Sequence, residues 1–121
     1  MKRNMDLVRE ILIGCEGDDK WEEVVGRLKS AGYGEEQIGF HVFLMGQGGL
    51  LEIINASHMD SHCQGLPLYI TWEGYEFLEA ARNQTLWNSA KAKIGSILQG
   101  LSFELLRAVL VAMAKGELGL S

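Results

Sequence analysis

The spacing of apolar residues in the first part of the chain predicts three helices in succession. Apolar side chains recur every three or four positions over residues 5–15, 19–30 and 34–45, which is the period of a helix with one buried face. Glycines follow each of these segments and indicate where the helices end. Gly26 interrupts the second segment, so a strand remains the alternative for residues 19–30.

A β-hairpin is predicted after the three helices. Residues 50–54 are short, apolar and β-branched, and residues 68–71 have the character of a returning strand. The polar residues between them form a long tip. Three helices followed by a hairpin is the layout of a winged helix-turn-helix, with residues 34–45 as the recognition helix and residues 55–67 as the wing.

The C-terminal part of the chain predicts three more helices, over residues 72–81, 85–98 and 102–116. We expect one mainly α (α+β) domain, with a winged-helix-like core at residues 1–82 and a C-terminal helical extension at residues 83–121. The last helix is almost wholly apolar, so it is either central or packed on another chain. It is therefore the candidate seam of a homodimer, formed by Phe103, Leu106, Leu110 and Met113.

Charge is unevenly distributed along the chain. The formal net charge is −5, and no Lys or Arg occurs from Ser30 to Ala81. Over the same residues there are seven carboxylates: Glu35, Glu36, Glu52, Asp60, Glu73, Glu76 and Glu79. An anionic stretch of this kind is unsuited to general binding of nucleic acids.

The expected outer face of the recognition helix carries no cation. Its residues are Gln37, Phe40, His41, Leu44 and Gln47. Lys and Arg supply nearly all of the sequence-independent attraction to DNA, so this face favours a protein partner or a second copy of the chain. Two alternatives remain. The C-terminal helices can bury these residues, and cations such as Lys2 and Arg3 can serve a DNA-binding transcriptional regulator.

Candidate chemistry is sparse. The wing contains possible metal donors, but no second cluster follows at zinc-finger spacing, so we expect no bound metal and no cofactor. The donors are His58, Asp60, His62 and Cys63. Cys15 lies on the apolar stripe of the first helix and is expected to be an inert core thiol. No nucleophile with a neighbouring base is apparent, so we expect a protein that is not an enzyme.

Four aromatic residues near the second strand are either core anchors or a platform for a ligand. They are Trp72, Tyr75, Phe77 and Trp87. Helical spacing favours the core, and on that interpretation replacing Trp72 by alanine would cost about 3–5 kcal/mol.

Three segments resemble domain-of-unknown-function family 2513, a family of small winged-helix-like proteins from bacteria and their phages. The segments are MKRNMDLVREIL, YGEEQIGFHVFLMGQGGLLE and ITWEGYEFLEAARNQTLWN. The resemblance implies the fold and a bacterial or phage setting, and it implies no particular activity.

Taken together, these observations predict a non-catalytic interaction module that binds a protein partner or itself. A winged-helix DNA-binding transcriptional regulator is the alternative. The chain shows neither a signal-peptide core nor a membrane span, so we expect a cytoplasmic protein without a membrane partner. No small-molecule substrate is evident.

Overall fold

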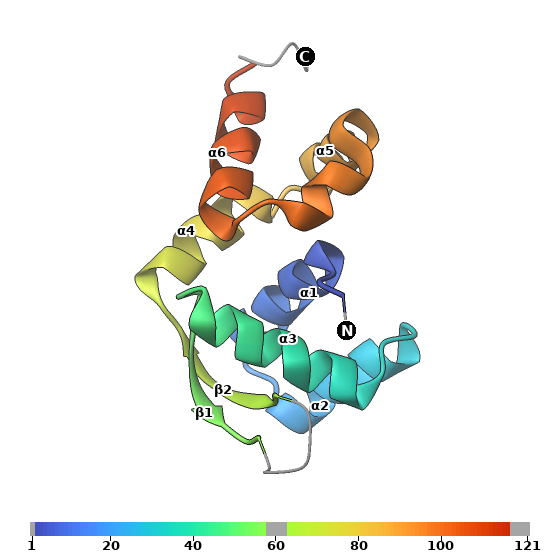
Figure 1. Ribbon diagram of the computed structural model, residues 1–121, viewed down its shortest axis with the longest axis vertical. Coiled ribbons are helices and arrows are strands. Elements are labelled where there is room, and N and C mark those ends of the chain that lie inside the picture. The colour runs from blue at the N-terminus through green and yellow to red at the C-terminus, as the bar shows by residue number, and fades with distance from the viewer. Residues whose placement is uncertain (1, 58–62, 117–121) are drawn as a thin grey trace.

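The computed structural model describes residues 2–57 and 63–116, and its elements follow the order predicted from the sequence. Three helices precede an antiparallel hairpin, and a helical extension follows it (Figure 1). The fold is therefore α+β, mainly helical and winged-helix-like. The elements are α1 (Met5–Glu16), α2 (Trp21–Ser30), α3 (Glu35–Gln47), β1 (Leu51–Asn55), β2 (Gly65–Ile70), α4 (Trp72–Ala81), α5 (Gln84–Ile94), the 3-10 helix η1 (Gly95–Gly100) and α6 (Phe103–Ala114).

Side-chain caps fix where four of these helices begin. The side-chain oxygens of Asn4, Thr71, Asn83 and Ser102 accept hydrogen bonds from backbone N–H groups in the first turns of α1, α4, α5 and α6. Residues 21–30 are helical, so the strand alternative there is wrong. The helix predicted to reach residue 98 ends at Ile94, because Gly95 has a φ of +57° and turns the chain into η1.

Helix α1 lies at the centre of the core, between α3 and the helices of the extension (Figure 1). Its buried Arg9 donates from Nε to the carbonyl oxygen of Ala81 at 2.6 Å and from Nη2 to that of Arg82 at 2.9 Å. Trp87 is also buried, and its indole Nε1 donates to Asp6 at 2.8 Å. The Arg9 contacts hold the end of α4 against α1, and the Trp87 contact attaches the C-terminal extension to α1 of its own chain.

The packing of α6 revises the prediction that its apolar side chains form a dimer seam. Leu106, Leu110 and Met113 are buried against α4 and α5 of the same chain, and Phe103 packs edge-on against Phe77. The helix is apolar because it completes the core, so Leu106, Leu110 and Met113 are not free to form a seam, and Phe103 is partly buried. Whether the protein forms dimers stays a prediction.

The hairpin has a buried and an exposed face. Leu51 pairs with Ile70 on the buried face, while Ile54 pairs with Leu66 on the exposed face. The register shifts between Glu52 and Ile53, which is the mark of a β-bulge in the opposite strand. The second strand begins at Gly65, earlier than predicted, and the hairpin packs across α3. A side chain at Gly65 would press on the backbone of Phe43, so glycine permits this close approach.

No helix in residues 2–57 and 63–116 is both long and apolar enough to cross a membrane.

Candidate functional site

Helix α3 exposes less of the predicted recognition face than expected. Gln47 is exposed, whereas Gln37, Phe40 and Leu44 are only partly accessible. His41 is fully buried, so its assignment to an outer face is wrong. The reason is that the segment before α1 covers this side of α3.

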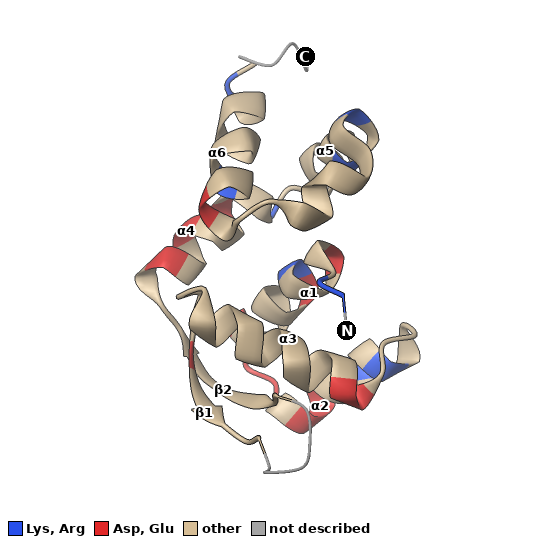
Figure 2. Cartoon of the chain, in the orientation of Figure 1, with Lys and Arg blue, Asp and Glu red and all other residues tan. Residues whose placement is uncertain are grey.

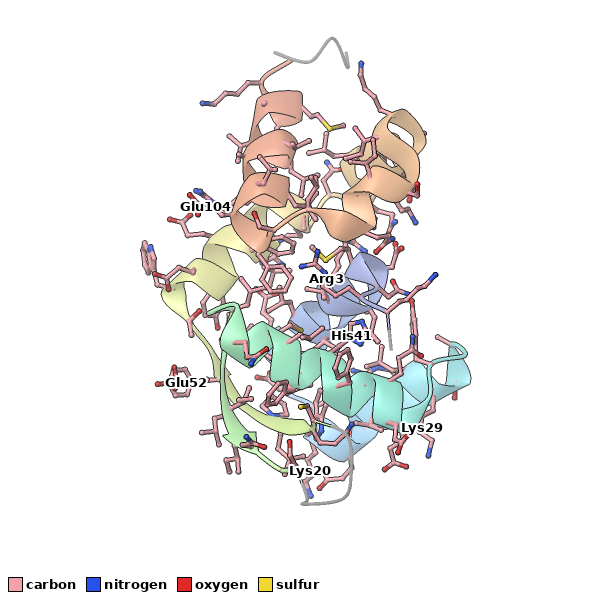
Figure 3. The ribbon with its side chains drawn as sticks, in the orientation of Figure 1. Arg3, Lys20, Lys29, His41, Glu52 and Glu104 are labelled. Atoms are coloured by element: carbon pink, nitrogen blue, oxygen red, sulfur yellow. The ribbon has the colours of Figure 1, made fainter. Side chains whose placement is uncertain are left out.

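Both ring nitrogens of His41 have hydrogen-bond partners that suit the neutral ring. The backbone N–H of Asn4 donates to Nε2 at 2.8 Å, and Nδ1 donates to the carbonyl oxygen of Gln37, also at 2.8 Å. Burial lowers the pKa of His41, against the opposing effect of the Gln37 carbonyl. Figure 3 shows the ring directed from α3 toward the N-terminal segment that carries Arg3. His41 is thus a structural contact between the N-terminal segment and α3.

Neither α3 nor the two strands carry a Lys or Arg (Figure 2). Several cations elsewhere are already paired with carboxylates of the chain. The pairs include Arg27 with Asp19 at 2.7 Å, Arg82 with Glu16 at 2.6 Å and Lys91 with Asp6 at 2.9 Å. The winged-helix elements that contact DNA in other proteins therefore present an uncharged to anionic surface here.

Large apolar side chains are exposed on the hairpin and on the first turn of α4. Trp72 is 76% exposed, Tyr69 61% and Leu68 57%. We call these exposed side chains together the wing–α4 patch, and they are Ile54, Leu66, Leu68, Tyr69, Trp72 and Tyr75. Leu66 and Leu68 line hollows beside α2, whereas Trp72 lines a groove toward α6. Exposed apolar groups gathered on neighbouring elements are typical of binding surfaces.

The exposure of Trp72 and Tyr75 corrects the prediction that all four aromatic residues are core anchors. Phe77 and Trp87 are buried as predicted. The buried stripe of α4 begins at Gly74, whose position would place any Cβ against the carbonyl oxygen of Leu50. The sequence contained the signal for this arrangement, because Gly74, Phe77, Leu78 and Ala81 have helical spacing on their own.

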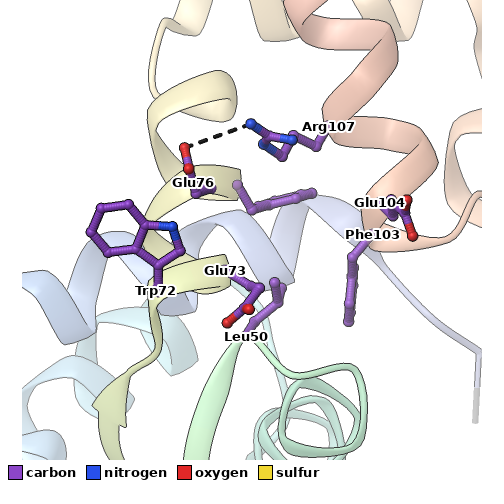
Figure 4. Close-up of a pocket in the computed structure, with 8 residues that line it drawn as sticks. Leu50, Trp72, Glu73, Glu76, Phe103, Glu104 and Arg107 are labelled. Carbon is purple, nitrogen blue, oxygen red and sulfur yellow. Dashed lines mark ion pairs between the residues drawn. The ribbon is translucent and has the colours of Figure 1, made fainter.

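A groove lies next to the patch, between α4 and α6 (Figure 4). Its volume is about 320 Å³. Apolar side chains form much of its lining, with Trp72 and Phe103 drawn at opposite sides in Figure 4. We call it the α4–α6 groove, and its lining residues are Leu50, Trp72, Glu73, Glu76, Phe77, Phe103, Glu104 and Arg107.

The charges of the α4–α6 groove are unbalanced. Arg107 forms an ion pair with Glu76 at 3.6 Å, and its buried Nε has no hydrogen-bond partner within the described part of the chain. Glu73 and Glu104 form no ion pair among the described residues. The groove thus combines an aromatic and aliphatic lining with two carboxylates that no residue in the described part of the chain neutralises.

The predicted metal donors are only partly described. His58, Asp60 and His62 lie outside the described residues, and Cys63 is an exposed free thiol. Within residues 2–57 and 63–116 no three His, Cys, Asp or Glu side chains are grouped as metal ligands would be. Cys15 packs against the core, and burial raises the pKa of its thiol to about 11.

Comparisons with known proteins place the chain in a family. A family of hypothetical proteins, DUF2513, matches residues 2–102. An uncharacterized protein of Haemophilus influenzae is 33% identical over 109 residues, which cover 90% of this chain and 92% of that protein. No solved structure matches the chain. The length of the family match, together with this relative, shows that the chain belongs to the DUF2513 family.

Proposed function

We propose that this protein is a non-catalytic interaction module that binds a protein partner through the wing–α4 patch. The observation that carries the proposal is the exposure of Leu68, Tyr69 and Trp72 on adjoining elements of the fold. A small domain gains nothing in its own stability from aromatic rings left in water, and tryptophan and tyrosine are the residues most enriched at the energetic centres of protein interfaces.

The charge of the winged-helix elements supports a protein partner over DNA. Binding to DNA depends on cations that neutralise phosphates, and α3, β1 and β2 supply none. Lys29 pairs with Glu35 at 3.6 Å, so no cation of this pair is free for a phosphate, and Glu52 on the exposed face of the hairpin would repel one. The carboxylate of Glu52 favours a partner that presents cations of its own.

Co-purification with matched surface variants tests the proposal. The double variant Leu68→Glu with Tyr69→Glu alters the patch, and Ile97→Glu alters an exposed apolar residue of η1 outside it. We expect the native chain and Ile97→Glu to retain the same partner from the native cell. The patch variant should bind the purified partner about tenfold more weakly or worse, as expected when an interface centre is lost.

Binding to duplex DNA is measured in parallel by fluorescence anisotropy at low salt. We expect no saturable binding. Saturable binding that weakens steeply with salt, and that is unchanged in the patch variant, would refute the proposal. Equal loss of the partner in the patch variant and in Ile97→Glu would also count against it, because the effect would then not be specific to the patch.

A further inference from the structure

We propose that the α4–α6 groove receives a lysine or arginine side chain from an extended segment of the partner, while the wing–α4 patch binds apolar residues next to it. This inference rests on the proposed function and specifies which chemistry the partner presents. Three observations carry it: the exposure of the Trp72 ring, the carboxylates of the groove that form no ion pair among the described residues, and the fact that Trp72 belongs to both groove and patch.

Trp72 supplies an aromatic face that its own chain does not use. The side chain is 76% exposed although it lines the groove, and the lining behind it is apolar through Leu50 and Phe77, which are buried. The face of an indole ring attracts a cation more strongly than the other aromatic side chains do. The long methylene stem of Lys or Arg can pack on the apolar lining while its charged end stays at the rim.

The carboxylates of the groove define the charge of the occupant. Glu73 lies one residue from Trp72 on α4, and Glu104 lies beside Phe103 on α6, so the two approach the groove from different helices. Arg107 is the groove's own cation, and Glu76 already engages it at 3.6 Å. A basic side chain would therefore be attracted by Glu73 and Glu104, whereas an acidic one would be repelled.

Trp72 belongs both to the groove and to the patch, so the two surfaces meet at this ring. Tyr69 and Leu68 precede it by a few residues at the end of β2. A segment with a basic residue in the groove would thus place its neighbouring residues over exposed apolar side chains. The occupant that fits both surfaces is a segment with basic and apolar residues. A second copy of this chain fits less well, because its own groove is anionic as well.

Selection from a phage-displayed library of short random peptides tests the inference on the full chain. We expect enriched peptides to share a Lys or Arg beside apolar residues. A selected peptide and its copy with norleucine in place of the basic residue are then compared by isothermal titration calorimetry. Norleucine keeps the apolar stem and removes the charge, and it should weaken binding by about tenfold or more.

Variants of the groove assign the effect to its residues. Two variants are compared: Trp72→Ala, and the double variant Glu73→Gln with Glu104→Gln. Each should lower the affinity for the basic peptide by about tenfold. Each should also reduce the difference in affinity between this peptide and its norleucine copy. The control combines Glu22→Gln with Glu23→Gln on α2, which removes the same charge from another exposed site and should leave binding unchanged. Thermal unfolding confirms that each variant folds.

Three outcomes would overturn the inference. Enriched peptides without basic residues that depend on Leu68 and Tyr69 would refute the groove and leave the proposed function standing. Spermidine, a small polycation, is titrated into the chain as a separate probe. If it binds the groove and the peptide does not displace it, the groove is a small-molecule site instead. Failure to select any peptide, together with failure of the patch variant to affect a captured partner, would refute both proposals.

Discussion

His41 is polar and fully buried, yet both of its ring nitrogens have partners within the fold. The N–H of Asn4 donates to one and the other donates to the carbonyl of Gln37. This arrangement fits only the neutral ring, because protonation would make Nε2 a donor that faces the N–H donor of Asn4. A helical face drawn from the sequence places His41 outside, since it cannot show that the residues before α1 fold back over α3.

Protonation of His41 should destabilise the fold. Its pKa is lowered in the folded state by burial, so the unfolded chain binds a proton at higher pH than the folded one. The contribution to stability is therefore complete above the unfolded value of about 6.5 and is lost as the pH falls through the folded pKa. Urea unfolding at a series of pH values should show the free energy of unfolding decreasing over this range.

His41→Gln isolates the contribution of this one residue to that pH dependence. The variant should be less stable at pH 8, and its free energy of unfolding should fall less between pH 7 and pH 5 than that of the native chain. The same slope in both proteins would show that His41 does not titrate as its surroundings imply.

At the scale of elements, α4 separates a buried face from an exposed aromatic face within ten residues. Phe77 and Leu78 are buried, whereas Trp72 is exposed at the first position of the helix. The stability of the domain and the proposed recognition by the wing–α4 patch therefore depend on different aromatic residues of one helix.

Alanine substitutions on α4 distinguish the two faces. Phe77→Ala should lower the free energy of unfolding by about 3–5 kcal/mol, because it leaves a cavity in the core. Trp72→Ala should change it by no more than about 0.5 kcal/mol, since its ring is mostly in water. Urea denaturation of both variants measures this difference, and comparable losses would mean that Trp72 packs in the core after all.

Most elements were predictable from the sequence because their boundaries have local causes. Thr71 and Ser102 cap the helices that follow them, and the short, apolar and β-branched run at residues 50–54 identifies β1. The wing–α4 patch was not predictable in this way. Leu68 stands at an irregular point of the hairpin register, so simple alternation does not tell which face it occupies.

At the scale of the whole molecule, α6 is a core helix of its own chain. Its apolar sequence is explained by contacts with α4 and α5. Sequence alone shows that such a helix must be covered, but not whether the cover belongs to the same chain or to a second one. Contacts between distant residues, such as Asp6 with Trp87, show that the extension packs on its own chain. No local sequence pattern reveals such contacts.

Leu110→Ala tests the role of α6 in the monomer. The variant should lose about 2–5 kcal/mol of stability, as is usual for a buried leucine. If α6 acts within one chain, this loss should be the same at low and high protein concentration. Thermal unfolding over a wide range of concentrations measures it, and a loss that grows with dilution would instead support a role in dimer formation.

The central position of α1 has a consequence for synthesis of the protein. Its backbone N–H at Met5 donates to Gln99, 94 residues further along the chain, and Arg9 donates to carbonyls of residues 81 and 82. A ribosome produces α1 long before these acceptors. Helix α1 can pack on α2 and α3 soon after synthesis, whereas its hydrogen bond to Gln99 forms only after residue 99 has left the exit tunnel.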